Sequence, residues 1–183
     1  MRTIVIVGSG GAGKSTLARR LGEITGIEVF HLDRLFWKSG WVSISKEELA
    51  EKVQEIVCSN SWIIDGNYSG TMELRFCAAD TIIFLDFPLW ACLLGILRRR
   101  LMYADRTRPD MAEGCDEKLD WEFFFWVITF PFKRRKGIIE KLHKCSQEKN
   151  VFILRNRRAV NSFIANVEVG NENYSSCGQQ YNN

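Results

Sequence analysis

The stretch GSGGAGKS, residues 8–15, decides the fold of this chain. It matches the pattern GxxxxGK[ST] at every fixed position. An apolar, β-branched run at residues 3–7 precedes it, and residues 14–25 after it carry apolar side chains at helical spacing. A glycine loop between a strand and a helix turns backbone N–H groups inward, and the helix adds its positive end. The stretch therefore predicts a loop that binds the phosphates of a nucleoside triphosphate.

Two side chains of this loop have predictable roles. Lys14 is expected to reach the β- and γ-phosphates, and the Ser15 hydroxyl is expected to be a ligand of Mg²⁺. The cofactors that we expect are therefore ATP and Mg²⁺. The loop residues expected to bind the nucleotide are Gly8, Ser9, Gly10, Gly11, Ala12, Gly13, Lys14, Ser15 and Thr16.

Apolar runs alternate with amphipathic segments along the rest of the chain. This alternation predicts an α/β fold, a three-layer sandwich in which helices cover both faces of a five-stranded parallel sheet. We expect one folded domain over residues 1–165, and the polar, Asn-rich residues 166–183 predict a flexible tail. The expected strands are 3–7, 27–33, 62–66, 80–88 and 151–155. The expected helices are 14–25, 45–57, 89–103, 117–130 and 133–148, the last two separated by Pro131, and a short helix after residue 155.

Three aspartates stand at or just after the ends of predicted strands. Because ligands of parallel sheets bind outside the carboxyl ends of the strands, these side chains are candidates for the site. Asp33 could orient or deprotonate an acceptor hydroxyl, and Asp65 could hold Mg²⁺ directly or through water. Asp86 fits a role in a turn or cap as well as a functional one. His31, on the second predicted strand, is expected to be structural.

Arginines gather around a polar stretch at residues 104–116 that contains proline and glycine. Phosphoryl transfer spreads negative charge over oxygens, and arginines on a mobile loop can stabilise that charge. We therefore predict a lid at about residues 95–116, with Arg99, Arg106 and Arg108 as candidate catalytic groups beside Lys14. For any single arginine, a solvated basic surface is the alternative.

Composition excludes several other classes of protein. A net charge of +3 on 183 residues is mild for a nucleic-acid binder. Six cysteines without any CxxC spacing give no zinc cluster and favour reduced thiols in a cytoplasmic protein. The longest apolar stretch, residues 82–97, is interrupted by Asp86 and Pro88 and is too short to span a bilayer. No membrane partner is expected.

Several longer motifs accompany the glycine loop. They are HLDRLFWKSGW (31–41), WIIDGNY (62–68), ADTIIFLDFP (79–88) and RTRPDMAEGC (106–115). Together with the loop, over residues 2–165, they resemble the bacterial DNA topology modulation protein family, within the adenylate-kinase-like P-loop kinases.

This resemblance implies a strand order of 2-3-1-4-5, an acceptor region after the second strand and a lid after the fourth. It implies that Asp65 helps to organise Mg²⁺, that Asp33 lies near the acceptor, and that Arg99 contacts phosphates. It also places Asn156 and Arg157 against the adenine. The chain departs from the family at Gly70 and Gly95, where relatives usually carry arginines that could contact acceptor or nucleotide.

Two functions remain open from the sequence. The first is a small-molecule kinase that transfers the γ-phosphoryl group of ATP to a nucleoside-like or nucleotide-like acceptor. The alternative is a nucleotide-dependent regulatory protein that acts on DNA topology or on a DNA-associated partner.

Aromatic residues gather in two regions of the sequence. One group could form a wall of the acceptor site or stack on a base. The other, WEFFFW at 121–126, could belong to the core or present a homodimer surface. The first group consists of Phe36, Trp37, Trp41 and Tyr68.

Overall fold

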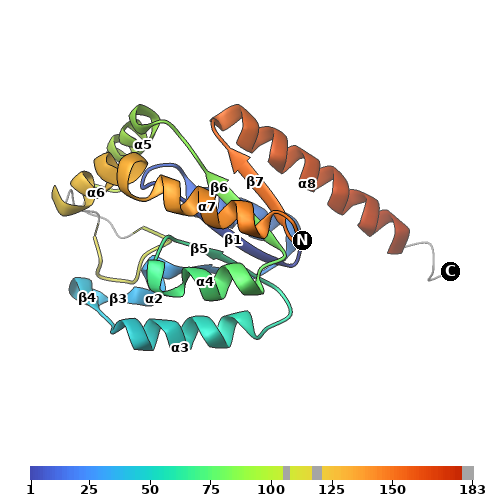
Figure 1. Cartoon of the computed structure of the whole chain (residues 1–183), viewed down its shortest axis with the longest axis horizontal. Helices are drawn as coiled ribbons and strands as arrows, with labels where there is room; N and C mark the ends of the chain where they lie inside the picture. Colours follow the sequence, from blue (N-terminus) through green and yellow to red (C-terminus); the bar gives the residue numbers. More distant parts are fainter. Residues whose placement is uncertain (105–107, 117–120, 179–183) are drawn as a thin grey trace.

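The computed structural model describes residues 1–104, 108–116 and 121–178, with side chains described up to residue 170. Five strands form a parallel sheet in the order β2-β5-β1-β6-β7 (Figure 1). Counted along the sheet-forming strands alone, this is the predicted order 2-3-1-4-5, so the α/β fold and its topology are confirmed. The bounds of the five strands are Thr3–Gly8 for β1, Val29–His31 for β2, Trp62–Asp65 for β5, Thr81–Leu85 for β6 and Asn150–Leu154 for β7.

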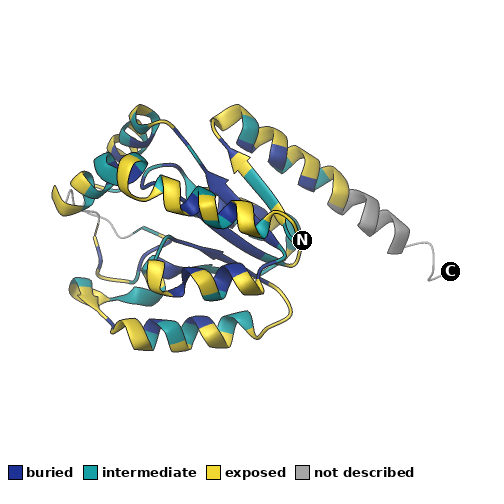
Figure 2. Cartoon of the chain, viewed as in Figure 1, coloured by how far each residue is buried: buried dark blue, intermediate teal, exposed yellow. Residues whose placement is uncertain are grey.

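Each strand alternates its side chains between two hydrophobic cores, one on each face of the sheet. Ile4 and Ile6 of β1 pack into one core, while Val5 and Val7 pack into the other. This is the period of two that a sheet covered on both faces requires. The interior strands are accordingly buried along their length (Figure 2).

Helices from distant parts of the chain complete the two cores. The first core is covered by α1 and α8, with α5 and α6 at its edge, and the second by α3, α4 and α7. The arrangement is the predicted three-layer sandwich. The bounds of these helices are Lys14–Thr25 for α1, Lys46–Val57 for α3, Ser69–Ala78 for α4, Leu89–Met102 for α5, Trp121–Lys133 for α6, Arg135–Cys145 for α7 and Arg157–Gly178 for α8.

The register of the sheet brings the predicted site residues to one edge. His31 at the end of β2 pairs in register with Asp65 at the end of β5, and Asp65 pairs with Ile6 of β1. The loop after β1 starts at the next residues, so three strand ends meet beside it. The fold alone therefore assembles side chains that are far apart in the sequence.

The structure differs from the sequence-based expectation in three places. Residues 32 and 33, expected to end a strand, and residues 34–43, for which no element is predicted, form the short helix α2 (Leu32–Phe36), a 3₁₀ turn (Ser39–Trp41) and a small antiparallel hairpin of β3 (Trp37–Lys38) and β4 (Val42–Ser43). Pro131 lies inside α6, which breaks only after Lys133. A proline disrupts the turn around it rather than cutting the chain at its own position.

The third difference is the length of the last helix. Helix α8 continues past residue 166 to Gly178, whereas the polar composition predicts a tail from there. Val160, Phe163 and Val167 recur at helical spacing and are all buried in the first core. This packing extends the helix beyond the predicted boundary. No helix in the described part of the chain is long and apolar enough to cross a membrane.

Candidate functional site

The glycine loop has the backbone conformation of an anion-binding loop. Gly11 and Gly13 adopt positive φ angles of 76° and 93°, which residues with a Cβ rarely adopt. Helix α1 begins at Lys14, directly behind the loop, so its free N–H groups face the same space. At the other end, the Asn67 side chain pairs with Gly8 twice. Its Oδ1 accepts from Gly8 N at 3.1 Å, and its Nδ2 donates to Gly8 O at 2.6 Å.

Helix α5 packs directly onto this loop, backbone against backbone. A Cβ on Gly95 would lie 2.1 Å from the Gly11 carbonyl oxygen, and a Cβ on Gly11 would lie 2.1 Å from the Cys92 oxygen. Gly95 therefore permits the contact between α5 and the loop, and an arginine at this position would not fit. At Gly70, by contrast, a Cβ would meet nothing within 4 Å, so this position is open.

The two charged candidates, Lys14 and Asp33, interact electrostatically with each other. Lys14 Nζ donates a hydrogen bond to Ser9 O at 3.1 Å. Burial lowers the pKa of Lys14, although Asp65 and Asp33 oppose this change. Burial raises the pKa of Asp33, against the effect of Lys14. Asp33 therefore holds a proton more readily than an aspartate in water, as a group that accepts a proton during a reaction should.

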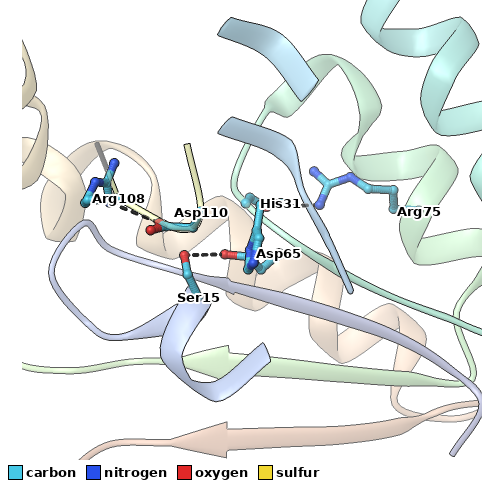
Figure 3. Close-up of polar contacts among 7 residues, drawn as sticks. Ser15, His31, Asp65, Arg75, Arg108 and Asp110 are labelled. Atoms are coloured by element: carbon cyan, nitrogen blue, oxygen red, sulfur yellow. Dashed lines mark hydrogen bonds and ion pairs between the residues drawn. The ribbon is translucent and has the colours of Figure 1, made fainter. Parts of the chain in front are cut away.

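Ser15, Asp65 and His31 form a connected polar chain at the strand ends (Figure 3). The Ser15 hydroxyl donates to Asp65 Oδ2 at 2.8 Å. The other carboxylate oxygen of Asp65 contacts His31 Nδ1, and both side chains are buried. Ser15 and Asp65 thus present the oxygen donors that Mg²⁺ prefers, and they fit the predicted metal site. Among the described residues, no group of three or more His, Cys, Asp or Glu side chains forms a metal cage, so nucleotide oxygens and water would complete the coordination.

A buried arginine that the sequence analysis did not single out supports this side of the site. Arg75 of α4 is fully buried, and its guanidinium donates to Gly66 O and Tyr68 O at 3.0 Å each. It also donates to Thr71 O at 3.2 Å. Burial lowers the pKa of Arg75 to about 10, against the effect of Asp65. Arg75 holds the turn between β5 and α4 that carries Asn67 and Tyr68.

The candidate arginines take different positions. Arg99 lies on α5 with its guanidinium 5.1 Å from the Phe123 ring centroid, and it lines the cleft. Arg108 lies in the segment after α5, while Arg106 lies outside the described residues. Arg157 covers the loop, since its Nη1 would lie 2.7 Å from a Cβ on Gly13. Asn156 accepts from Ala159 N at 2.9 Å and so caps helix α8.

Asp86 is a structural residue in this molecule. Its two carboxylate oxygens accept from Arg135 Nε and Nη2 at 2.7 and 2.8 Å, and Arg155 lies 3.8 Å away. This forked pair joins the end of β6 to the start of α7. The choice between a structural and a functional role, which the sequence leaves open, is thus resolved by the neighbours of Asp86.

The segment after α5, residues 108–116, closes over the site, and we call it the lid loop. It bonds to the β3–β4 hairpin: Gly40 N donates to Gly114 O at 3.1 Å, and Cys115 Sγ donates to Lys38 O at 3.2 Å. The sequence predicts a lid here, and the described residues show this segment lying against both the hairpin and the site. The contact could not be predicted, because it joins residues 77 positions apart.

One cleft of about 1230 Å³ is lined by the glycine loop, Asp33, Arg99 and the lid loop. Cationic side chains predominate around it, as a site for phosphates requires. Trp37, Trp41 and Tyr68 form an aromatic side of the cleft near Asp33. The basic side chains that line it are Lys14, Arg19, Arg98, Arg99, Arg108, Arg134, Lys141 and Arg157, and the acidic ones are Asp33, Asp110 and Glu122.

The aromatic helix α6 divides between core and surface. Val127 and Phe130 are buried, and Phe123 and Trp126 pack against the cores. Trp121 and Phe125 are instead exposed, by 77% and 63%. Helix α6 also packs against the glycine loop, because a Cβ on Gly10 would lie 2.6 Å from the Phe123 ring. The core interpretation of WEFFFW therefore holds for Phe123 and Trp126, whereas the homodimer surface stays a prediction.

Solved structures with a similar fold include two shikimate kinases. The chain is similar to shikimate kinase from Acinetobacter baumannii in complex with shikimate, with a TM-score of 0.55, 16% identity, and coverage of 91% of this chain and 90% of that one. A shikimate kinase from Bacteroides thetaiotaomicron aligns with a TM-score of 0.47, 19% identity, and coverage of 92% and 97%. No family profile and no curated protein match the chain.

The structural likeness defines the class of fold. The chain has an α/β fold with a five-stranded parallel sheet, similar to the fold of the Acinetobacter baumannii shikimate kinase. At 16% identity, the likeness carries the fold and not the substrate. The resemblance to the DNA topology modulation protein family remains a prediction from the sequence motifs.

Proposed function

We propose that this protein is an ATP-dependent small-molecule kinase that phosphorylates a hydroxyl group held beside Asp33. The observation that carries the proposal is the juxtaposition of Lys14 and Asp33 in one cleft, between the glycine loop and an aromatic wall. Lys14 and the loop N–H groups suit the phosphates, while Asp33 suits a proton that must be removed.

In the proposed reaction, the acceptor hydroxyl oxygen forms a bond to the γ-phosphorus as the bond from that phosphorus to the β–γ bridging oxygen breaks. The hydroxyl proton passes to an oxygen of Asp33, and ADP leaves. Lys14, Arg99 and Arg108 stabilise the charge that spreads over the transferred group. Ser15 and Asp65 would hold Mg²⁺, which neutralises charge on the nucleotide when it is bound.

The acceptor is proposed to be nucleoside-like or nucleotide-like. The support is the aromatic side of the cleft, because planar rings stack favourably on Trp and Tyr side chains. Phe36 packs on Tyr68 with ring centroids 4.9 Å apart, and Trp37 on Trp41 at 5.4 Å. These contacts give the wall a fixed geometry. The non-glycine residue Trp41 has a positive φ of 63°, a strained conformation of the kind found at ligand sites.

The alternative function, regulation of DNA topology, would need basic side chains on a surface that a duplex can reach. Arg99 and Arg108 instead line the cleft and are only partly exposed. This placement favours a small phosphorylated ligand over DNA.

The test is an acceptor screen that follows ADP release with the full chain. A panel of nucleosides, nucleotides and other hydroxylated metabolites should include one that raises ATP turnover sharply. Lys14→Ala should abolish this turnover, whereas Lys136→Ala, which removes a lysine with an 87% exposed side chain, should not affect it. A panel without any acceptor-dependent ADP release, together with DNA binding that weakens steeply with salt, would favour the regulatory function instead.

A further inference from the structure

Asp110 of the lid loop lies buried at the predicted metal site. Asp110 is only 7% exposed, although it comes from a polar stretch of sequence. Arg108 Nη1 donates to Asp110 Oδ2 at 3.0 Å, which holds the carboxylate in place. Figure 3 shows Asp110 between Arg108 on one side and the pair of Ser15 and Asp65 on the other. The sequence motifs give no role to this residue.

Two carboxylates therefore converge on one hydroxyl group. Ser15 donates its single proton to Asp65 Oδ2 at 2.8 Å, and Asp110 also interacts with the Ser15 side chain. One proton cannot serve both carboxylates at once. A buried carboxylate is unfavourable unless it is paired with a cation or coordinates a metal ion. Arg108 pairs with Asp110, and His31 Nδ1 contacts Asp65.

The donor set is suited to a hard divalent cation. A serine hydroxyl and two carboxylates offer oxygen atoms only, and Mg²⁺ prefers one or two carboxylates together with phosphate and water oxygens. Ser15 belongs to helix α1 and Asp65 to strand β5, whereas Asp110 comes from the lid loop. A metal ion held by all three would join the lid loop to the sheet.

We propose that Asp110 is a further ligand of the Mg²⁺ that accompanies the nucleotide, so that metal binding fastens the lid loop over the phosphates. The inference rests on the proposed function, because the nucleotide brings the metal. The lid loop then supplies both charges that the reaction needs, only two residues apart. Asp110 faces the metal, and Arg108 can turn from Asp110 toward the phosphates.

The test measures metal affinity directly, without catalysis. The full chain is saturated with a non-hydrolysable ATP analogue, and Mn²⁺ binding is followed by electron paramagnetic resonance. Asp110→Asn should weaken Mn²⁺ binding by about tenfold or more, because losing even a residue that only supports a metal ligand typically costs about 10–100-fold in metal affinity. Glu113→Gln makes the same change of charge at an exposed position of the same loop and should leave Mn²⁺ affinity unchanged.

A second measurement covers the case in which Asp110→Asn fails to fold. In the unmodified chain, hydrogen exchange of residues 108–116 should slow more with analogue plus Mg²⁺ than with analogue in EDTA. A merely structural role for Asp110 predicts equal protection of these residues in both conditions. For an Asp110→Asn variant that folds, it also predicts that the affinity for the analogue falls equally with and without metal.

The outcomes separate the two proposals. Unchanged Mn²⁺ affinity in Asp110→Asn, with normal analogue binding, overturns the role of Asp110 and leaves the kinase proposal standing. If the unmodified chain binds no analogue at all, the kinase proposal fails, and the metal role of Asp110 fails with it.

Discussion

Replacing Gly95 by alanine should destabilise the protein, even though alanine is the better helix former. At an ordinary helical position, the change from Gly to Ala stabilises by about 0.5–1 kcal/mol. At Gly95 the new Cβ would lie 2.1 Å from the Gly11 oxygen, and side-chain carbons almost never come closer than 3.0 Å to such an atom. Helix α5 and the loop must therefore separate by about 0.9 Å to bring this distance up to 3.0 Å. Both partners are backbone, so neither can rotate away.

The magnitude follows from these two opposing effects. Overpacking a tight contact costs about 1–3 kcal/mol, which exceeds the gain in helix propensity. We expect a net loss of about 1–2 kcal/mol, which corresponds to a fall in Tm of about 2–8 °C for a chain of this size. Because the displaced atoms belong to the phosphate loop, the affinity for an ATP analogue should also fall.

Thermal unfolding followed by circular dichroism measures the effect, with Gly137→Ala as the matched control. Gly137 lies in helix α7 with nothing within 4 Å of a new Cβ, so that variant should gain stability. If Gly95→Ala lowers the Tm and Gly137→Ala raises it, the difference can be attributed to the contact between helix α5 and the loop. A Gly95→Ala variant as stable as the unmodified chain, with unchanged analogue affinity, would refute the packing argument.

Three further predictions follow from the site and the surface. Asp33→Asn should raise the Tm of the ligand-free protein at neutral pH. Burial raises the pKa of Asp33, so this carboxyl group ionises at lower pH in the unfolded chain than in the folded protein, and the stability falls as pH rises above the ordinary value of 3.8. The gain in Tm from Asp33→Asn should therefore shrink toward pH 4. A gain that does not depend on pH would contradict this cause. Arg75→Met should cost about 2–4 kcal/mol in urea unfolding, because buried carbonyl groups of the β5–α4 turn lose their donors; a loss under about 0.5 kcal/mol would show that water replaces them. Exposed apolar side chains on α5, among them Leu97 and Leu101, should favour a homodimer, and Leu97→Glu with Leu101→Glu should lower the sedimentation coefficient; a monomer at high concentration would remove this prediction.

The sequence predicts the parts of this molecule that depend on local pattern. The glycine loop, Lys14 and Ser15 are carried by one short motif between a strand and a helix. Asp65 is predictable because it ends an apolar run, and parallel strands bring their ends together. The strand order follows from the family resemblance, and the structure confirms it.

The parts that the sequence does not predict depend on long-range contacts. Asn67 and Arg75 are ordinary polar residues in the sequence, and only the closed β5–α4 turn shows that both satisfy backbone groups. Asp110 belongs to a stretch with the composition of a solvated loop, and its burial depends on how that loop folds back. Gly95 is only a departure from the family in the sequence, and its close contact with Gly11 is visible only in the folded structure.

The hairpin and the lid loop are joined through main-chain carbonyl groups, Gly114 O on one side and Lys38 O on the other. Carbonyl acceptors persist whatever side chain a position carries. Trp37 and Trp41 flank one of these acceptors and line the cleft, so they can be exchanged without removing the oxygen that receives the lid loop. The contacts that hold the lid loop are thus separate from the side chains that line the cleft. Substitutions of the cleft-facing side chains of the hairpin can therefore change which acceptor is preferred while the contact with the lid loop is kept.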